Sequence, residues 1–175
     1  MKIGIKNIVL DHLSTLQNAK SDKISAFDIF LFYGLPLILA ILVYIDKIKF
    51  GSEVFSQSIA VFSIFSALLF SVQVALFGIY TKKREEVDEY SEAFSKERIE
   101  ARRVLVRETN ANISYLIVLS AGSVTIFLSC FAIKIFDRFE PALAVFLYLH
   151  FMFTLLMIIK RVHALFDKEY QLDKL

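Results

Sequence analysis

Residues 54–80 read VFSQSIAVFSIFSALLFSVQVALFGIY and contain no charged side chain. A helix of about 20 apolar residues is long enough to cross a hydrocarbon layer about 30 Å thick. Three further runs, 29–45, 113–135 and 141–159, have the same character, and their only charge is Lys134 near the end of one run. We therefore expect an all-α, polytopic membrane protein with four transmembrane helices.

The composition of the chain excludes several other classes. Of its 175 residues, 57% are hydrophobic and 22% are charged, which does not fit a water-soluble enzyme, a disordered chain or a disulfide-stapled secreted module. Cys130 is the single cysteine, so an intrachain disulfide, a cysteine metal cluster and dithiol redox chemistry are excluded. A net charge of +2 gives no reason to expect direct binding of nucleic acid.

The basic residues predict the orientation in the membrane. Sixteen of the 20 Lys and Arg lie before the first run, in the segment 81–112 or after the last run. Basic residues concentrate on the cytoplasmic side of membrane proteins. We expect a multi-pass protein of the inner (plasma) membrane with both termini and the segment 81–112 in the cytosol.

The chain reads as a single domain, 1–175, with spans at about 26–45, 54–80, 113–136 and 141–160. Before the first span, Ile5, Ile8, Val9, Leu13 and Leu16 share one face of an amphipathic helix over 3–17. This helix either packs against the bundle or lies on the inner leaflet in a membrane-sensing or gating role.

The first span has a predicted start and a predicted kink. Ser25 and Asp28 have the spacing of a capping box, so the helix should begin near residue 26. Pro36 lies inside the apolar run, where proline bends a helix and deprives a carbonyl one turn earlier of its amide partner.

A stripe of small residues runs along the second span. Such stripes let helix backbones approach closely in lipid. The stripe indicates helix packing within or between protomers, and the alternative is a hydroxyl-lined path for water or ions. Its members are Ser56, Ala60, Ser63, Ala67, Ser71, Ala75 and Gly78.

The segment 81–112 is expected to continue the helix and reverse near Ser95 as a cytosolic helical hairpin. It carries eight acidic and eight basic residues, so it is neutral overall. It is either a solvated hairpin or a docking surface for a soluble cytosolic protein. The candidate docking residues are Glu85, Asp88, Glu92, Arg98, Arg102 and Arg103.

His150 is the one ionisable residue in the middle of an apolar run, and Thr154 follows it one turn later. An ionisable group inside a membrane is a functional candidate. Counting depth along the spans places Pro36, Ser63, Ser66 and Thr125 near the same layer. The imidazole is interpreted as a neutral packing group bonded to a hydroxyl or carbonyl, as a proton-linked gate or relay, or, with least support, as a metal ligand.

Other chemistry finds no support in the sequence. His12 and His163 are expected to be surface or interfacial residues. No catalytic constellation, cofactor motif or metal-ligand spacing occurs, so we expect no enzyme, no cofactor and no bound metal.

Two functions fit these features best. The first is an oligomeric scaffold or sensor that contacts membrane lipids and engages a cytosolic partner through the hairpin. The second is a channel or membrane-depolarising pore with a polar midplane around His150. A transporter is weaker because no span contains a carboxylate.

The chain plan of four spans, short external hairpins and the charged segment Lys82–Arg107 resembles the four-span membrane subunit of the Kiwa anti-phage defence system. The resemblance covers the layout and involves no diagnostic motif, so it assigns no functional residue. It implies a homo-oligomer that senses phage attack at the inner membrane and works with a cytosolic DNA-binding partner.

Overall fold

The computed structural model describes residues 4–16, 25–87, 95–133 and 139–172, and these ranges are all helix, turn or connection. The helices are α1 (Ile5–Ser14), α2 (Ala26–Ile29), the π-helical turn η1 (Phe30–Gly34), α3 (Leu35–Ile45), α4 (Ser52–Val87), α5 (Ser95–Ile133) and α6 (Glu140–Leu172). The all-α class expected from the sequence is confirmed.

Four helical segments are long and apolar enough to cross a membrane, as expected for a multi-pass membrane protein. They are Ala26–Ile45, Glu53–Gly78, Arg103–Cys130 and Glu140–Asp167. The third segment starts earlier than the sequence predicts, because α5 is continuous from Ser95 and no break in the backbone marks where the apolar run begins.

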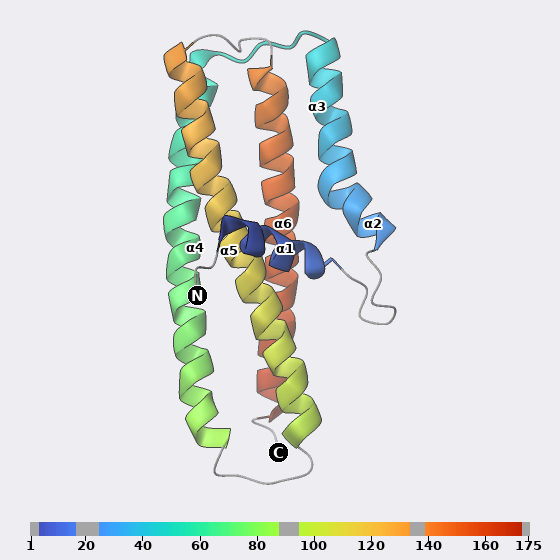
Figure 1. Ribbon diagram of the computed structural model, residues 1–175, viewed down its shortest axis with the longest axis vertical. Coiled ribbons are helices and arrows are strands. Elements are labelled where there is room, and N and C mark those ends of the chain that lie inside the picture. Colours follow the sequence, from blue (N-terminus) through green and yellow to red (C-terminus); the bar gives the residue numbers. More distant parts are fainter. Residues whose placement is uncertain (1–3, 17–24, 88–94, 134–138, 173–175) are drawn as a thin grey trace.

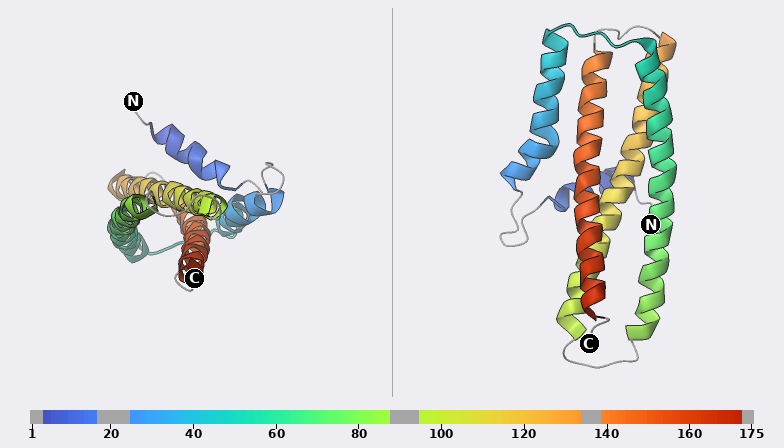
Figure 2. Two further views of the ribbon diagram at one scale, coloured as in Figure 1. Left: turned by 90° about the horizontal axis from the view of Figure 1, so that it is seen from below. Right: turned by 180° about the vertical axis from the view of Figure 1, so that it is seen from behind.

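The long helices α4, α5 and α6 run side by side along the molecule, and the shorter α3 packs against α6 (Figure 1). Helix α1 lies across them, about halfway along their length. Viewed along the bundle, α1 lies outside the group of long helices and against α5 (Figure 2). Helix α1 therefore meets the bundle at α5, near the middle of that helix.

The continuation of helix beyond the second span is confirmed, since α4 reaches Val87. The expected reversal and two of the candidate docking residues, Asp88 and Glu92, lie outside the described residues. Glu85, Arg98 and Arg102 lie on helices, but their side chains are also outside the description, whereas Arg103 is exposed. The hairpin's role as a docking surface stays a prediction.

The core lies between α4, α5 and α6 and is rich in aromatic rings. Phe62 is fully buried on α4 and packs against Phe127 of α5 and Phe151 of α6, with ring centroids 6.0 and 5.4 Å away. Phe55 and Leu69, seven residues before and after Phe62 on α4, belong to the same core. Large side chains thus form the face of α4 that packs inside the protomer.

The stripe of small residues points the other way. All seven members, Ser56, Ala60, Ser63, Ala67, Ser71, Ala75 and Gly78, are exposed. On a helix of 3.6 residues per turn they lie opposite the face that carries Phe62 and Leu69. The stripe therefore does not pack inside the protomer. Contact between protomers is the packing interpretation that remains.

The first span begins and bends where the sequence predicts. The Asp28 amide donates to the Ser25 hydroxyl at 3.3 Å, which is the expected cap. The π-helical turn η1 comes directly before Leu35 and Pro36, and the chain changes direction between α2 and α3 (Figure 1). Pro36 has no N–H, so the Phe32 carbonyl lacks its ordinary partner four residues later.

Candidate functional site

Helix α1 docks on the bundle through a face that is partly polar. Ile8 and Val9 pack against the core as the amphipathic pattern predicts, whereas Ile5 is 65% exposed. His12 and Thr15 share the docked face, and the exposed fraction of His12 is 0%. Of the two positions expected for His12, surface or interfacial, the structure gives the interfacial one, because His12 is buried between α1 and α5.

His12 is held by two residues of α5. Its Nδ1 lies 2.7 Å from Asn112 Oδ1, and since an amide oxygen only accepts, Nδ1 donates. Its ring stacks on Tyr115 with the centroids 3.9 Å apart and the planes 1° from parallel. Burial lowers the pKa of His12 to about 4, although the bond to Asn112 opposes this shift. His12 is therefore neutral at pH 7.

Tyr115 connects His12 to His150. The Tyr115 hydroxyl lies 2.7 Å from His150 Nε2, and His150 Nδ1 lies 2.8 Å from the Phe32 carbonyl oxygen. A carbonyl only accepts, so Nδ1 carries the proton, and Nε2 of the neutral ring accepts from Tyr115. The imidazole thus satisfies the carbonyl that Pro36 deprives of its ordinary partner.

The surroundings of His150 differ from the layer expected by counting depth. Thr154 donates from Oγ1 to the His150 carbonyl at 2.8 Å, and the Tyr33 ring lies 4.6 Å from the imidazole. Ser63 and Thr125 are exposed, and the Thr125 hydroxyl bonds to its own helix at Ala121. Ser66 is half-buried. The structure brings together His150, Thr154 and the carbonyl freed by Pro36, and it leaves Ser63 and Thr125 apart from them.

Arg161 ties the end of α1 to the two long helices. Its Nη2 donates to the Thr15 carbonyl at 2.7 Å and lies 3.4 Å from Glu108 Oε2. The side chains of Arg161 and Glu108 are 15% and 31% exposed. Solvent screens the attraction between these two charges less than it screens a pair at the surface. Removing either partner would leave the other charge partly buried and poorly solvated.

These residues form one unit, which we call the polar junction: His12 of α1 and Thr15 directly after it, Phe32 of η1, Glu108, Asn112 and Tyr115 of α5, and His150, Thr154 and Arg161 of α6. Its contacts run without a gap from α1 to the bend of the first span. Sequence reasoning found His150, Thr154 and Pro36. It did not identify Asn112 and Tyr115 as partners of the histidines. The pattern that could have indicated them is their spacing of three residues, about one helical turn, where the apolar run 113–135 begins.

The polar junction is not fully satisfied. Among the described residues, five buried side-chain atoms have no hydrogen-bond partner: His12 Nε2, Thr109 Oγ1, Asn112 Nδ2, Ser120 Oγ and Arg161 Nη1. A buried polar group left unpaired costs about 1–3 kcal/mol. Three of these atoms, on His12, Asn112 and Arg161, belong to the polar junction, so its polar groups are only partly paired.

The polar junction consists of imidazole, amide, hydroxyl, carboxylate and guanidinium groups. In the described part of the chain, no three His, Cys, Asp or Glu side chains are grouped to hold a metal ion. His163 is exposed, as expected.

Comparisons with protein families, curated proteins and solved structures found no match for this chain. The resemblance to a defence-system subunit thus extends only to the layout of four apolar helices.

Replacing Tyr115 with Phe tests the link between the two histidines. Tyr115→Phe keeps the ring that stacks on His12 but leaves His150 Nε2 without its donor, so the free energy of unfolding should fall by about 1–2 kcal/mol. Titration with SDS in mixed micelles, followed by circular dichroism, measures this change. Tyr148→Phe, a matched change on α6 where the ring packs on Phe62, should have little effect. Equal losses in both variants would contradict the assigned bond.

The docking of α1 should weaken in acid. The pKa of His12 is about 4 when docked and 6.5 ordinarily, so the undocked helix binds a proton first. Docking is then fully stable above pH 6.5 and weakens by up to about tenfold per pH unit as the pH falls towards 4. Hydrogen exchange of the α1 amides at pH 7 and pH 5, corrected for intrinsic rates, measures this.

The variant His12→Phe keeps an aromatic ring at this position and cannot bind a proton, so the pH dependence of α1 exchange should disappear. His163→Gln removes an exposed histidine and should leave it unchanged. If His12→Phe retained the full dependence, another group would be responsible and the interpretation would be wrong.

Proposed function

We propose that the protein is an oligomeric scaffold and sensor of the inner membrane, in which α1 couples the state of the inner leaflet to the first span. The observation that carries the proposal is the polar junction, because it connects α1 to the bend in the first span through His12, Tyr115 and His150. The positive-inside distribution supports a cytosolic location of α1.

The two faces of α1 suit this role. Ile8, Val9 and Leu16 face the bundle, while Ile5 and Leu10 are 65% and 51% exposed. The helix lies beside Asn112 and Arg161, where the apolar runs 113–135 and 141–159 end. At that depth an amphipathic helix can exchange contacts with protein for contacts with the headgroup region. The bilayer would thus compete with the bundle for α1.

Release of α1 would reach the first span through defined contacts. Without α1, Tyr115 loses the stacked His12 ring, and the Tyr115–His150–Phe32 contacts lose one support. The Phe32 carbonyl lies at the π-helical turn, a type of bulge often found at functional sites. A ligand or lipid can shift such an equilibrium only by its differential affinity for the two states.

Assembly and partner binding complete the proposal. The outward stripe on α4 supports a homo-oligomer, since small side chains permit close approach of a second copy. A soluble cytosolic protein would bind at the hairpin beyond the spans. The anti-phage setting is part of the proposal on the resemblance of layout alone. The proposal assigns no catalytic role to the chain.

Disulfide cross-linking tests the oligomer. In a Cys130→Ala background, Ala67→Cys should form a disulfide-linked dimer on mild oxidation in native membranes, because the stripe faces another protomer. Leu69→Cys, two residues later and 5% exposed, should remain monomeric. Val72→Cys, 44% exposed but off the stripe, controls for random collision. Equal dimer yields at Ala67 and Val72 would contradict an interface at the stripe.

Spin-label distances test the sensor. Labels at Leu10→Cys on α1 and His163→Cys on α6, both exposed positions, report whether α1 is docked. In nanodiscs, electron–electron double resonance should show a second, longer distance whose population changes with chain length and anionic lipid content. Asn112→Ala, which removes the partner of His12, should enlarge that population in every bilayer. A single distance that no bilayer and no variant alters would overturn the proposal.

The channel remains a second candidate because of one observation. The outward stripe of α4 carries the hydroxyls of Ser56, Ser63 and Ser71, which could line an axis between protomers. His150 does not serve this path, since it is 1% exposed and both ring nitrogens are bonded. Ion flux into vesicles containing the protein, reduced in Ser63→Ala and unchanged in His150→Gln, would favour the channel.

A further inference from the structure

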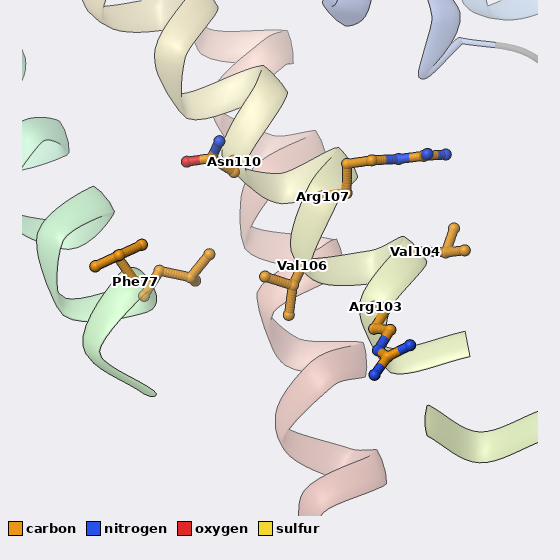
Figure 3. Close-up of a pocket in the computed structure, with 7 residues that line it drawn as sticks. Phe77, Arg103, Val104, Val106, Arg107 and Asn110 are labelled. Carbon is orange, nitrogen blue, oxygen red and sulfur yellow. The ribbon is translucent and has the colours of Figure 1, made fainter. Parts of the chain in front are cut away.

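A groove between α4 and α5 lies apart from the polar junction. Its volume is about 470 Å³, and its walls include Leu76 and Phe77 from α4 and Arg103, Val106, Arg107 and Asn110 from α5. Val106 points from α5 towards α4, Phe77 lies on α4 at the edge of the groove, and the two arginines extend outward from the other side of α5 (Figure 3). The groove thus combines an apolar floor with two guanidinium groups.

The α5 residues recur at the spacing of one helix face. Arg103, Val106, Arg107 and Asn110 follow one another by three, one and three residues, which places them together on the groove. Arg103 and Arg107 are one turn apart and both exposed. Two neighbouring guanidinium groups can bind phosphate oxygens in a forked geometry that a single ammonium group lacks.

The polar end of the groove is ordered by α4. Gln73 donates from Nε2 to Asn110 Oδ1 at 3.0 Å and to Ser114 Oγ at 2.7 Å. The Asn110 oxygen accepts from Gln73, so the nitrogen Nδ2 of the same amide is left as a donor. Asn110 lines the groove, and this donor is therefore beside it. The arginines and this amide offer donors at different depths, which suits a ligand with both phosphate and ester oxygens.

The groove lies at the ends of two candidate spans. The second apolar segment ends at Gly78, next to Phe77, and Arg103 to Asn110 lie just before the apolar run 113–135. On the other side of Asn110, the outer face of α4 continues with Phe70 and Val74, which are 60% and 56% exposed. A ligand whose charged group lies at the arginines could therefore place its apolar part on this face of α4. Its charge would stay outside the membrane interior.

We propose that this groove binds an anionic phospholipid of the cytosolic leaflet. The phosphate binds between Arg103 and Arg107, the glycerol esters lie near Asn110, and the acyl chains pass Phe77 towards Phe70. Basic pockets at the cytosolic ends of spans are the usual sites for anionic headgroups, and each arginine near such lipid strengthens binding about fivefold. This inference concerns lipid selectivity and is independent of the docking of α1.

Lipid-specific quenching tests the proposal in the full chain. The protein contains no tryptophan, so Phe77→Trp introduces a single reporter at the groove. In phosphatidylcholine vesicles, brominated phosphatidylglycerol should quench this tryptophan with a relative binding constant at least about fivefold above that of brominated phosphatidylcholine. Combining the reporter with Arg103→Gln and Arg107→Gln should reduce the ratio to about one, and added salt should reduce it in the parent.

Two controls make the result specific. Leu156→Trp places the reporter on α6, at a position that is 55% exposed and outside the groove lining, and should show little preference. Lys160→Gln removes an exposed charge on α6 and should leave the preference at Phe77→Trp unchanged. Equal quenching by both lipids would overturn the proposal. So would an equal loss in Lys160→Gln, which would indicate a diffuse surface charge.

Discussion

The hydrogen bond from His150 to the Phe32 carbonyl is the interaction on which the inside of this bundle depends. Pro36 takes away the ordinary partner of that carbonyl, and an unpaired carbonyl away from water is costly. The 2.8 Å bond supplies a donor from α6 and so fixes the tautomer of the imidazole. The other ring nitrogen must then accept, which selects the Tyr115 hydroxyl as its partner. One defect in the first span thereby determines the orientation of side chains on two other helices.

The same arrangement gives α1 its place. Once Tyr115 is oriented by His150, the open face of its ring receives His12, and Asn112, three residues earlier on α5, receives the His12 donor. Arg161 closes the contact through the Thr15 carbonyl. Polar groups at this depth have few alternative partners, so the geometry is well specified. The unpaired atoms of His12 and Asn112 subtract from its stability, and a contact that is specific but weak is the kind that a bilayer can displace.

Much of the fold follows from patterns that local physics determines. The apolar runs are charge-free because charges are expensive in hydrocarbon, and they became the four candidate spans. The cap at Ser25 and the freed carbonyl near Pro36 follow from groups within one turn of each other, and both were predicted. The partners of His12 were not predicted, for an equally physical reason. A histidine on an amphipathic helix looks exposed unless its partners are known, and Asn112 is 100 residues away.

The sequence by itself determined the apolar runs, the helices and the bend, because each depends on composition or on neighbours along the chain. Only the tertiary structure decided which face of each helix is inside. By its sequence, the stripe of small residues on α4 could pack inside the protomer or against another protomer. The structure places the face with Phe55, Phe62 and Leu69 inside, because these large side chains fill the space between three long helices. Likewise, only the packing of α6 against α5 and η1 decided that His150 meets a tyrosine and a carbonyl, while Ser63 and Thr125 remain outside.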